Sequence, residues 1–324
     1  MKLFKTISKV LKSEYAVLLL LVIIMIALSA ATPLFMTSGN ILNIISRTAT
    51  TGIIGIGITF VIATGGIDLS VGGQMAFASV LGTLFMMEGM PPVLVVFTMI
   101  LLGALTGLAN GVLISYMKLP AFMVTLAMLN VTEGLAFYLT TGKTLYEIPE
   151  AFSRISLTTI GGIPLSAIYL VIVAIIGQIV LRKFTLGRRI LALGGNPRGA
   201  WFAGINVKRN KMIAYMLCGI TAGISAVIMV SRLMSTSANI GDGVELDAIA
   251  SAVIGGAALS GGSGNMIGTL AGALILTAIN NWMNLMTIDP FLRDVVKGII
   301  ILLALAFDAW RKGELSKLKL REID

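Results

Sequence analysis

Long apolar stretches alternate with short polar connections along most of the chain. The stretches lie at about 15–32, 44–64, 71–87, 92–115, 120–141, 164–181, 211–231, 247–259, 266–286 and 291–310. About 18 or more apolar residues in a row are enough to cross the hydrocarbon core of a bilayer. The pattern therefore predicts an all-α polytopic membrane protein of about ten transmembrane helices, with no soluble domain.

Two glycine-rich interruptions fall in corresponding parts of the chain, at 65–73 and 261–264. The apolar stretch at 247–259 is short for a full crossing and runs into the second interruption, as broken helices beside a permeation path do in transporters. We interpret residues 1–324 as a single permease domain built from two pseudo-repeated halves. Its expected parts are a first half at about 15–181, a cytoplasmic coupling loop at 182–211, a second half at about 212–310 and a cytoplasmic tail at 311–324.

Charge is distributed unevenly along this hydrophobic chain. Hydrophobic residues make up 57% of it, the mean hydropathy is +0.97 and the formal net charge is +9. With the N-terminus inside, 18 of the 24 Lys and Arg residues fall in the cytoplasm, as the positive-inside rule requires. The distribution thus explains the positive charge by membrane orientation rather than by nucleic-acid binding. It predicts a multi-pass protein surrounded by lipid, with both termini in the cytoplasm.

The chain offers little material for metal, redox or enzymatic chemistry, since it has one Cys and no His. No disulfide can form within it, and the commonest metal ligand and proton shuttle is missing. Residues 141–144, Thr-Gly-Lys-Thr, imitate the end of a phosphate-binding loop, but Phe137 stands where that motif needs glycine and a membrane helix precedes it. No catalytic set is found elsewhere. We therefore expect a protein that is not an enzyme and holds no cofactor or metal.

The segment at 182–211, called the basic platform below, contains eight Lys or Arg residues and no acidic residue. Within it, Asn196 can cap a helix that starts at Pro197, and Gly204 suits the left-handed residue that ends one. The resulting short helix carries Trp201 and Phe202. A helix of about two turns is too short to be stable alone, and two aromatic side chains are unfavourable in water. We therefore expect the platform to dock on a partner.

Three motifs that occur in order along the chain resemble those of the permease subunits of ribose-type ABC importers. They are Gly-Ile-Asp-Leu-Ser-Val-Gly at 66–72, Gly-Gly-Asn with Gly-Ile-Asn-Val at 194–196 and 204–207, and Gly-Val-Glu-Leu-Asp-Ala-Ile-Ala at 243–250 with its glycine-rich continuation to 269. The resemblance covers about residues 30–310. It implies a permease of the bacterial inner membrane that works as a homodimer. It also implies a separate ABC ATPase subunit on the cytoplasmic side and a periplasmic sugar-binding protein on the outer face.

The same resemblance implies that the helix at 196–204 is the coupling helix that contacts the ATPase. The residues expected in this contact are Gly194, Gly195, Asn196, Pro197, Ala200, Trp201, Phe202 and Gly204. Two positions depart from the family pattern. Glu133 stands where such permeases usually carry Arg, and Arg293 stands where Gln is common. Both lie toward the outer half of the membrane, so they bear on the identity of the sugar.

Charged residues of the outer loops are candidates for docking the binding protein, because charge complementarity sets encounter rate and orientation. They are Arg154, Arg232, Asp242 and Glu245. The alternative is that they are ordinary solvated loop charges. Candidates for the substrate path are the polar residues within apolar stretches, although such residues more often form hydrogen bonds between helices. They are Asn130, Glu133, Asn280, Asn281 and Lys297.

Two of these residues are ionisable and share a depth in the membrane. Counted from the outer ends of their stretches, Glu133 and Lys297 both lie ~10–12 Å below the surface at ~1.5 Å of rise per residue. Because an unpaired charge at this depth is unfavourable, we expect the two side chains to face the bundle interior and to pair.

The resulting hypothesis is a passive translocation subunit that alternates between outward- and inward-facing states while a separate ATPase hydrolyses ATP. Its substrate would be a small neutral sugar, since the apolar stretches contain hydroxyls and amides but few full charges. An ion-coupled secondary transporter is one alternative, with Glu133 as the coupling carboxylate. A permease for branched-chain amino acids on a similar scaffold is another. Uptake without the ATPase would favour the former, and the ligand that the binding protein retains would identify the latter.

Overall fold

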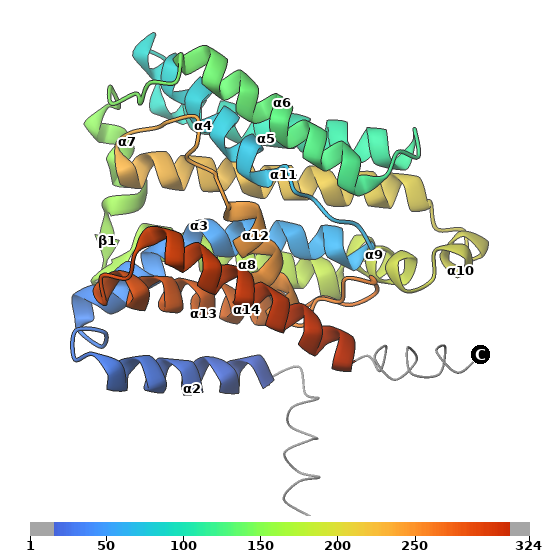
Figure 1. The fold of residues 1–324 in the computed structure, drawn as a ribbon. Coiled ribbons are helices and arrows are strands. Elements are labelled where there is room, and N and C mark those ends of the chain that lie inside the picture. The colour runs from blue at the N-terminus through green and yellow to red at the C-terminus, as the bar shows by residue number, and fades with distance from the viewer. Residues whose placement is uncertain (1–15, 312–324) are drawn as a thin grey trace, which may run out of the picture.

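Helices follow the apolar stretches in the computed structural model, which describes residues 16–311. The long or apolar helices are α2 (Ala16–Ala31), α3 (Ser38–Ala63), α4 (Val71–Met87), α5 (Pro92–Ser115), α6 (Ala121–Thr140), α8 (Leu165–Lys183), α11 (Val207–Leu233), α12 (Val244–Ile254), α13 (Met266–Leu285) and α14 (Pro290–Arg311). Most of them run side by side along one direction (Figure 1). The basic residues of the N-terminal segment and residues 312–324 of the expected tail lie outside the described residues.

Six of these helices, α3, α5, α6, α8, α11 and α13, are long and apolar enough to cross a membrane. Helices α2 and α4 are equally apolar but shorter, with 16 and 17 residues. The chain is therefore a multi-pass, all-α membrane protein, as its sequence predicts. Ten crossings and an internal repeat stay predictions.

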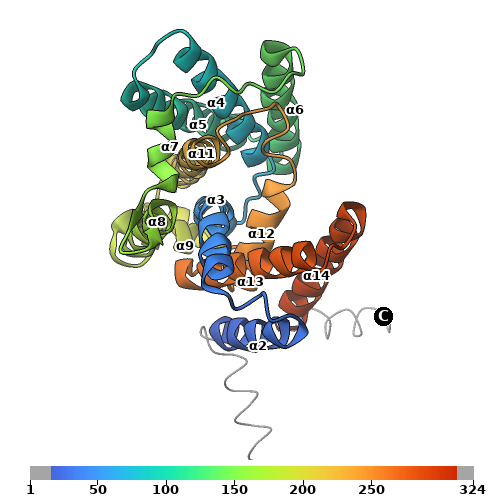
Figure 2. The ribbon, with the colours of Figure 1, turned by 90° about the vertical axis from the view of Figure 1, so that its left-hand side faces the viewer.

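Helix α11 lies at the centre of the bundle. It runs between α5 on one side and α3 on the other, as both views show (Figures 1 and 2). Glycines allow α5 to approach α11 very closely, since a methyl group on Gly103 or Gly107 would overlap the backbone of α11 around Gly219. Small residues at such crossings are typical of packing in lipid, where van der Waals contact drives helix association.

The connection at 142–163 contains a short helix and a small hairpin that its sequence does not predict. Helix α7 (Glu150–Leu157) precedes a small antiparallel hairpin of β1 (Thr159–Ile160) and β2 (Ile163–Pro164). The helix is anchored on the end of α11, where the Ser156 backbone N–H donates to the Ser231 hydroxyl at 2.9 Å. Phe152 is fully buried beneath it. This segment is thus a packed cap on one end of the bundle rather than a loose loop.

Two connections run deep into the bundle instead of around it. Residues 64–70 carry the chain from α3 to α4 in a non-helical conformation, and residues 234–243 lead into the 11-residue helix α12. The start of α4 lies against the second connection, because a methyl group on Gly72 would lie 2.5 Å from the Gly241 carbonyl oxygen. The sequence at 247–259 predicts a short, interrupted helix, and α12 confirms it.

Candidate functional site

The basic platform folds as two helices rather than one helix in a loop. Helix α9 (Thr185–Gly195) was not predicted, whereas α10 (Pro197–Phe202) was. In addition, α11 already starts at Val207, because the Asn206 side chain caps it by accepting from the Arg209 backbone N–H at 3.0 Å. The sequence does contain a pattern of spacing that indicates α9. Gly187, Ile190, Leu193 and Gly194, which are buried, repeat at the spacing of a helix face.

The predicted ends of α10 are confirmed. The Asn196 side chain accepts a hydrogen bond from the Gly199 backbone N–H at 2.9 Å, and Pro197 occupies the first helical position. Gly204 adopts the left-handed conformation, with φ 77°, just after the helix. Its backbone N–H donates to the Trp201 carbonyl at 2.9 Å. These local hydrogen bonds fix both ends of α10.

Two aromatic side chains of α10 are exposed on the surface of the bundle. Trp201 is 65% exposed and Phe202 is 81% exposed, and their rings meet edge to face with centroids 5.0 Å apart. Ala200, however, is only 5% exposed and faces the rest of the chain. Helix α10 thus turns Ala200 toward its own bundle, so that of the expected apolar face only Trp201 and Phe202 are exposed; the contact with the ATPase stays a prediction.

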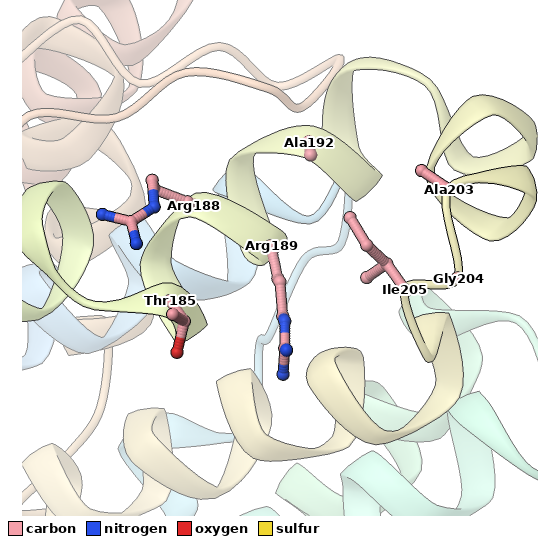
Figure 3. Close-up of a pocket in the computed structure, with 7 residues that line it drawn as sticks. All are labelled: Thr185, Arg188, Arg189, Ala192, Ala203, Gly204 and Ile205. Carbon is pink, nitrogen blue, oxygen red and sulfur yellow. The ribbon is translucent and has the colours of Figure 1, made fainter.

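A hollow of about 370 Å³ opens beside the aromatic pair, between α9 and the connection from α10 to α11 (Figure 3). It is lined by Thr185, Arg188, Arg189, Ala192, Ala203, Gly204 and Ile205. Arg189 points from α9 toward the start of α11, whereas Arg188 points away (Figure 3) and donates to the Lys183 carbonyl at 2.8 Å. The platform thus offers exposed aromatic rings on α10 and a recess with positive charge next to α9.

The four charged residues expected on the outer loops do not form one surface. Arg154 and Asp242 are exposed. Arg232 is half-buried, and its guanidinium donates to the Ser46 carbonyl at 3.4 Å and to the Met229 sulfur at 3.0 Å. Glu245 is also half-buried and turns inward. Arg232 and Glu245 are therefore not free loop charges, because helix packing draws both side chains toward the bundle, and docking of the binding protein on these four residues stays a prediction.

Glu245 instead lines a small pocket where α4, α6 and the 234–243 connection meet. The pocket has a volume of about 30 Å³ and is lined by Gly72, Gly73, Ala76, Leu129, Glu133, Ala238, Gly241, Asp242 and Glu245. We call it the acidic pocket, because three carboxylates share it. One carboxylate oxygen of Glu245 is buried without a hydrogen-bond partner. The volume has room for about one water molecule.

The expected pairing of Glu133 with Lys297 is wrong. The Lys297 ammonium lies 3.5 Å from an Asp247 carboxylate oxygen, which joins α14 to α12. Glu133 lies in the acidic pocket on α6, among other carboxylates. Helix α14 packs on α12 rather than on α6. The two residues share a predicted depth in the membrane, but they do not pair because their helices pack on different neighbours.

The three asparagines proposed for the substrate path do not line the acidic pocket. Asn281 is buried and forms a reciprocal amide pair with Asn40, with bonds of 3.0 and 2.9 Å, so it joins α13 to α3. Asn130 is exposed and donates to the Leu126 carbonyl of its own helix at 2.9 Å. Asn280 is half-buried on α13. Two of the three thus serve helix structure.

A buried polar network follows α3, in the motif at 66–72. Ser70 is its hub, because its hydroxyl donates to Asp68 and accepts from the side-chain amides of Gln74 at 2.6 Å and Asn110 at 2.7 Å. Neither the Asp68 nor the Ser70 side chain caps α4. They instead tie the 64–70 connection to α4 and α5.

Comparison with known proteins gives consistent relatives. The family described as branched-chain amino acid transport system / permease component matches residues 40–305. The ribose import permease of Bacillus subtilis (strain 168) is 40% identical, over 89% of this chain and 90% of its own. That of Escherichia coli (strain K12) is 36% identical over 92% of each chain. The D-allose transport system permease protein of the latter organism is 33% identical over 91% of each. No solved structure matches the chain.

Proposed function

The chain belongs to the family of branched-chain amino acid transport system permease components, and we propose that it is the membrane-spanning subunit of an ABC importer for a ribose-like monosaccharide. The observation that carries this proposal is the similarity to ribose and allose permeases over about nine-tenths of the chain. These relatives are named for sugars, which favours a sugar over a branched-chain amino acid. The three sequence motifs resemble those of the permease subunits of ribose-type ABC importers, which work with a separate ATPase and a binding protein. This resemblance disfavours an ion-coupled carrier.

The proposed partner on the platform is an ABC ATPase subunit. Trp201 and Phe202 supply an exposed apolar contact, and Arg189 supplies charge in the adjoining hollow. The sequence has no nucleotide-binding motif, so ATP would be hydrolysed in that separate chain. We further propose ten membrane crossings, cytoplasmic termini, a permease homodimer and a periplasmic sugar-binding protein that docks on the opposite end, where Arg154 is exposed, with the exposed Asp242 as a further candidate contact.

The proposed sugar path passes through the acidic pocket. Carboxylates such as Glu133 and Glu245 are good acceptors for sugar hydroxyls, and broken segments at mid-membrane are typical of substrate sites in transporters. The pocket is far smaller than the ~300–1,000 Å³ that ligand sites usually have. Alternating access would therefore require α4 and the 234–243 connection to separate and to admit the sugar.

Reconstitution tests the proposal directly. The permease is incorporated into liposomes with the ATPase and binding protein of the same importer, and uptake of labelled ribose, allose and leucine is measured with and without ATP. We expect ATP-dependent sugar uptake and none of leucine. ATP-dependent leucine uptake would instead favour the amino-acid permease, and sugar uptake driven by an ion gradient without the ATPase would favour the secondary transporter.

A further inference from the structure

Three segments of the chain touch backbone to backbone at the platform end of the bundle. Gly194, in the last turn of α9, is buried, and a methyl group there would overlap the Ala63 carbonyl oxygen and lie 2.5 Å from the Gly262 nitrogen. The Gly262 N–H itself donates to the Ala63 carbonyl at 3.0 Å. We call this three-way contact of residues 63, 194 and 262 the glycine junction.

Each of the three segments continues into a different element that would move in the proposed transport cycle. Gly194 comes two residues before Asn196, which caps the docking helix α10. Ala63 ends α3 and is followed by the 64–70 connection to α4. Gly262 lies in the 255–265 connection that joins α12 to α13. The connections from α3 and from α12 both reach the neighbourhood of α9 (Figure 1).

The segments that contain Ala63 and Gly262 also lead to two walls of the acidic pocket. Ala63 leads through the 64–70 connection to the start of α4, and Gly262 leads back through α12 to its first turn. Gly72 and Gly73 at the start of α4 line it from one side, and Gly241 and Glu245 line it from the other. A displacement of the platform therefore has a continuous route to both walls. The junction contains no side chain whose rotamer could change and absorb such a displacement, and close-packed interfaces shift between discrete arrangements rather than deform gradually.

We infer that Gly194 is the positioning residue that couples the platform to the acidic pocket. Its missing side chain lets α9 rest directly on Ala63 and Gly262, so that a movement imposed on α10 displaces α4 and α12 together. This inference rests on the proposed function, because it assumes an ATPase that moves α10. A side chain at position 194 separates the three backbones and breaks the transmission without touching the aromatic docking pair.

The adjacent glycine supplies a matched control. A methyl group on Gly195 would meet its nearest neighbour, the Gly262 Cα, at 3.9 Å, which is an ordinary contact. Gly194 is buried, so a methyl group there does not reach the surface of the platform, and in liposomes with ATPase and binding protein we expect Gly194→Ala to keep the assembled complex and its basal ATP hydrolysis. Sugar uptake should fall by about tenfold or more, within the range of typical coupling free energies, so that more ATP is consumed per sugar. Gly195 is exposed and belongs to the expected ATPase contact, so Gly195→Ala is compared at equal amounts of bound ATPase, where its uptake should match the wild type.

Two results of that experiment would overturn the inference. One is normal sugar uptake by Gly194→Ala, and the other is an equal loss of uptake in Gly195→Ala. A melting temperature measured on each detergent-solubilised complex shows whether Gly194→Ala is folded. If it is not, the wild-type protein provides the test through hydrogen exchange of its backbone amides.

In that measurement, the wild-type complex is compared with and without a non-hydrolysable ATP analogue. We expect amides in 64–70 and 258–265 to change their protection together with those in 194–204. A change confined to 194–204 would refute the coupling through Gly194 while leaving the docking proposal intact. No ATPase binding and no change at 194–204 would refute the proposed function itself.

Discussion

Asp68 shows how a single side chain can be buried in this fold without a counter-ion. It is fully buried, one of its carboxylate oxygens has no hydrogen-bond partner, and no cation pairs with it among the described residues. Burial raises the pKa of this carboxyl, and hydrogen bonds from Ser70 lower it by less. A raised pKa means that the neutral form persists to higher pH than it does for an exposed aspartate, and Asp68 is held by its hydrogen bonds with Ser70 rather than by a counter-ion.

This argument predicts different outcomes for two substitutions of Asp68. Asp68→Asn keeps a neutral, hydrogen-bonding side chain and should change the free energy of unfolding by about 1 kcal/mol or less. Asp68→Leu leaves the Ser70 donors unsatisfied and should destabilise by at least about 2 kcal/mol. Melting in detergent measures both, with the exposed Asp289→Asn as a control. An Asn variant as unstable as the Leu variant would show that the carboxylate is charged.

Lys297 and Asp247 offer a second test at the level of single residues. Because both side chains are partly exposed, at 31% and 16%, their ion pair should contribute about 1 kcal/mol. A double-mutant cycle with Lys297→Met and Asp247→Asn should give a coupling energy of about that size. The same cycle with Glu133→Gln in place of Asp247→Asn should be additive. Coupling to Glu133 instead would contradict the observed pairing.

These residues also show which features of single side chains can be predicted from the sequence. The Asn196 cap and the left-handed Gly204 depend only on neighbours in the chain, so local rules predict both. The partner of Lys297 depends on the direction in which α14 faces. Counting residues from a helix end gives depth but no rotation about the helix axis.

At the scale of elements, α10 is the part whose role is easiest to test. Phe202→Asp places a charge in the proposed apolar contact, and burying an unpaired charge is unfavourable by several kcal/mol. We expect the ATPase to be lost on co-purification while the permease stays in the membrane. Tyr146→Asp is the matched control, because Tyr146 is also an exposed aromatic residue, at 72%, but lies in the connection after α6. Retention of the ATPase by Phe202→Asp would contradict docking on α10.

The long helices could be predicted from hydrophobicity almost to the residue, as for α4 and α5, whereas α7 was missed and α9 left only a weak signal of four buried positions. Both missed helices are short and amphipathic, and their apolar faces contain only a few residues. Such helices are stabilised by the surface on which they pack rather than by their own sequence. Ser231 on α11 is the partner that fixes α7, and it lies 75 residues away in sequence.

At the scale of the whole molecule, the acidic pocket is closed, and the proposed cycle must open it. Ala76 lines the pocket and is 1% exposed. In a Cys218→Ser background, Ala76→Cys should resist a membrane-impermeant maleimide in the isolated permease. It should react when the ATPase, binding protein and ATP are all present.

Asp242→Cys serves as the control for that experiment, because Asp242 borders the pocket but is exposed and should react in both conditions. Equal labelling of Ala76→Cys with and without ATP would contradict a gate at this position. The closed state could not be predicted from the sequence, because it depends on the contact between Gly72 and Gly241, which belong to different halves of the chain.

The central position of α11 has a consequence for how the protein is made. Helix α5 is synthesised roughly a hundred residues before α11, which is about 5–20 s at ~5–20 residues per second. During that interval, the glycine face of α5 has no native partner in the lipid. The first half of the chain therefore cannot complete its native packing on its own. A ribosome that stalls between α5 and α11 leaves an incomplete bundle, which membrane quality control has to remove.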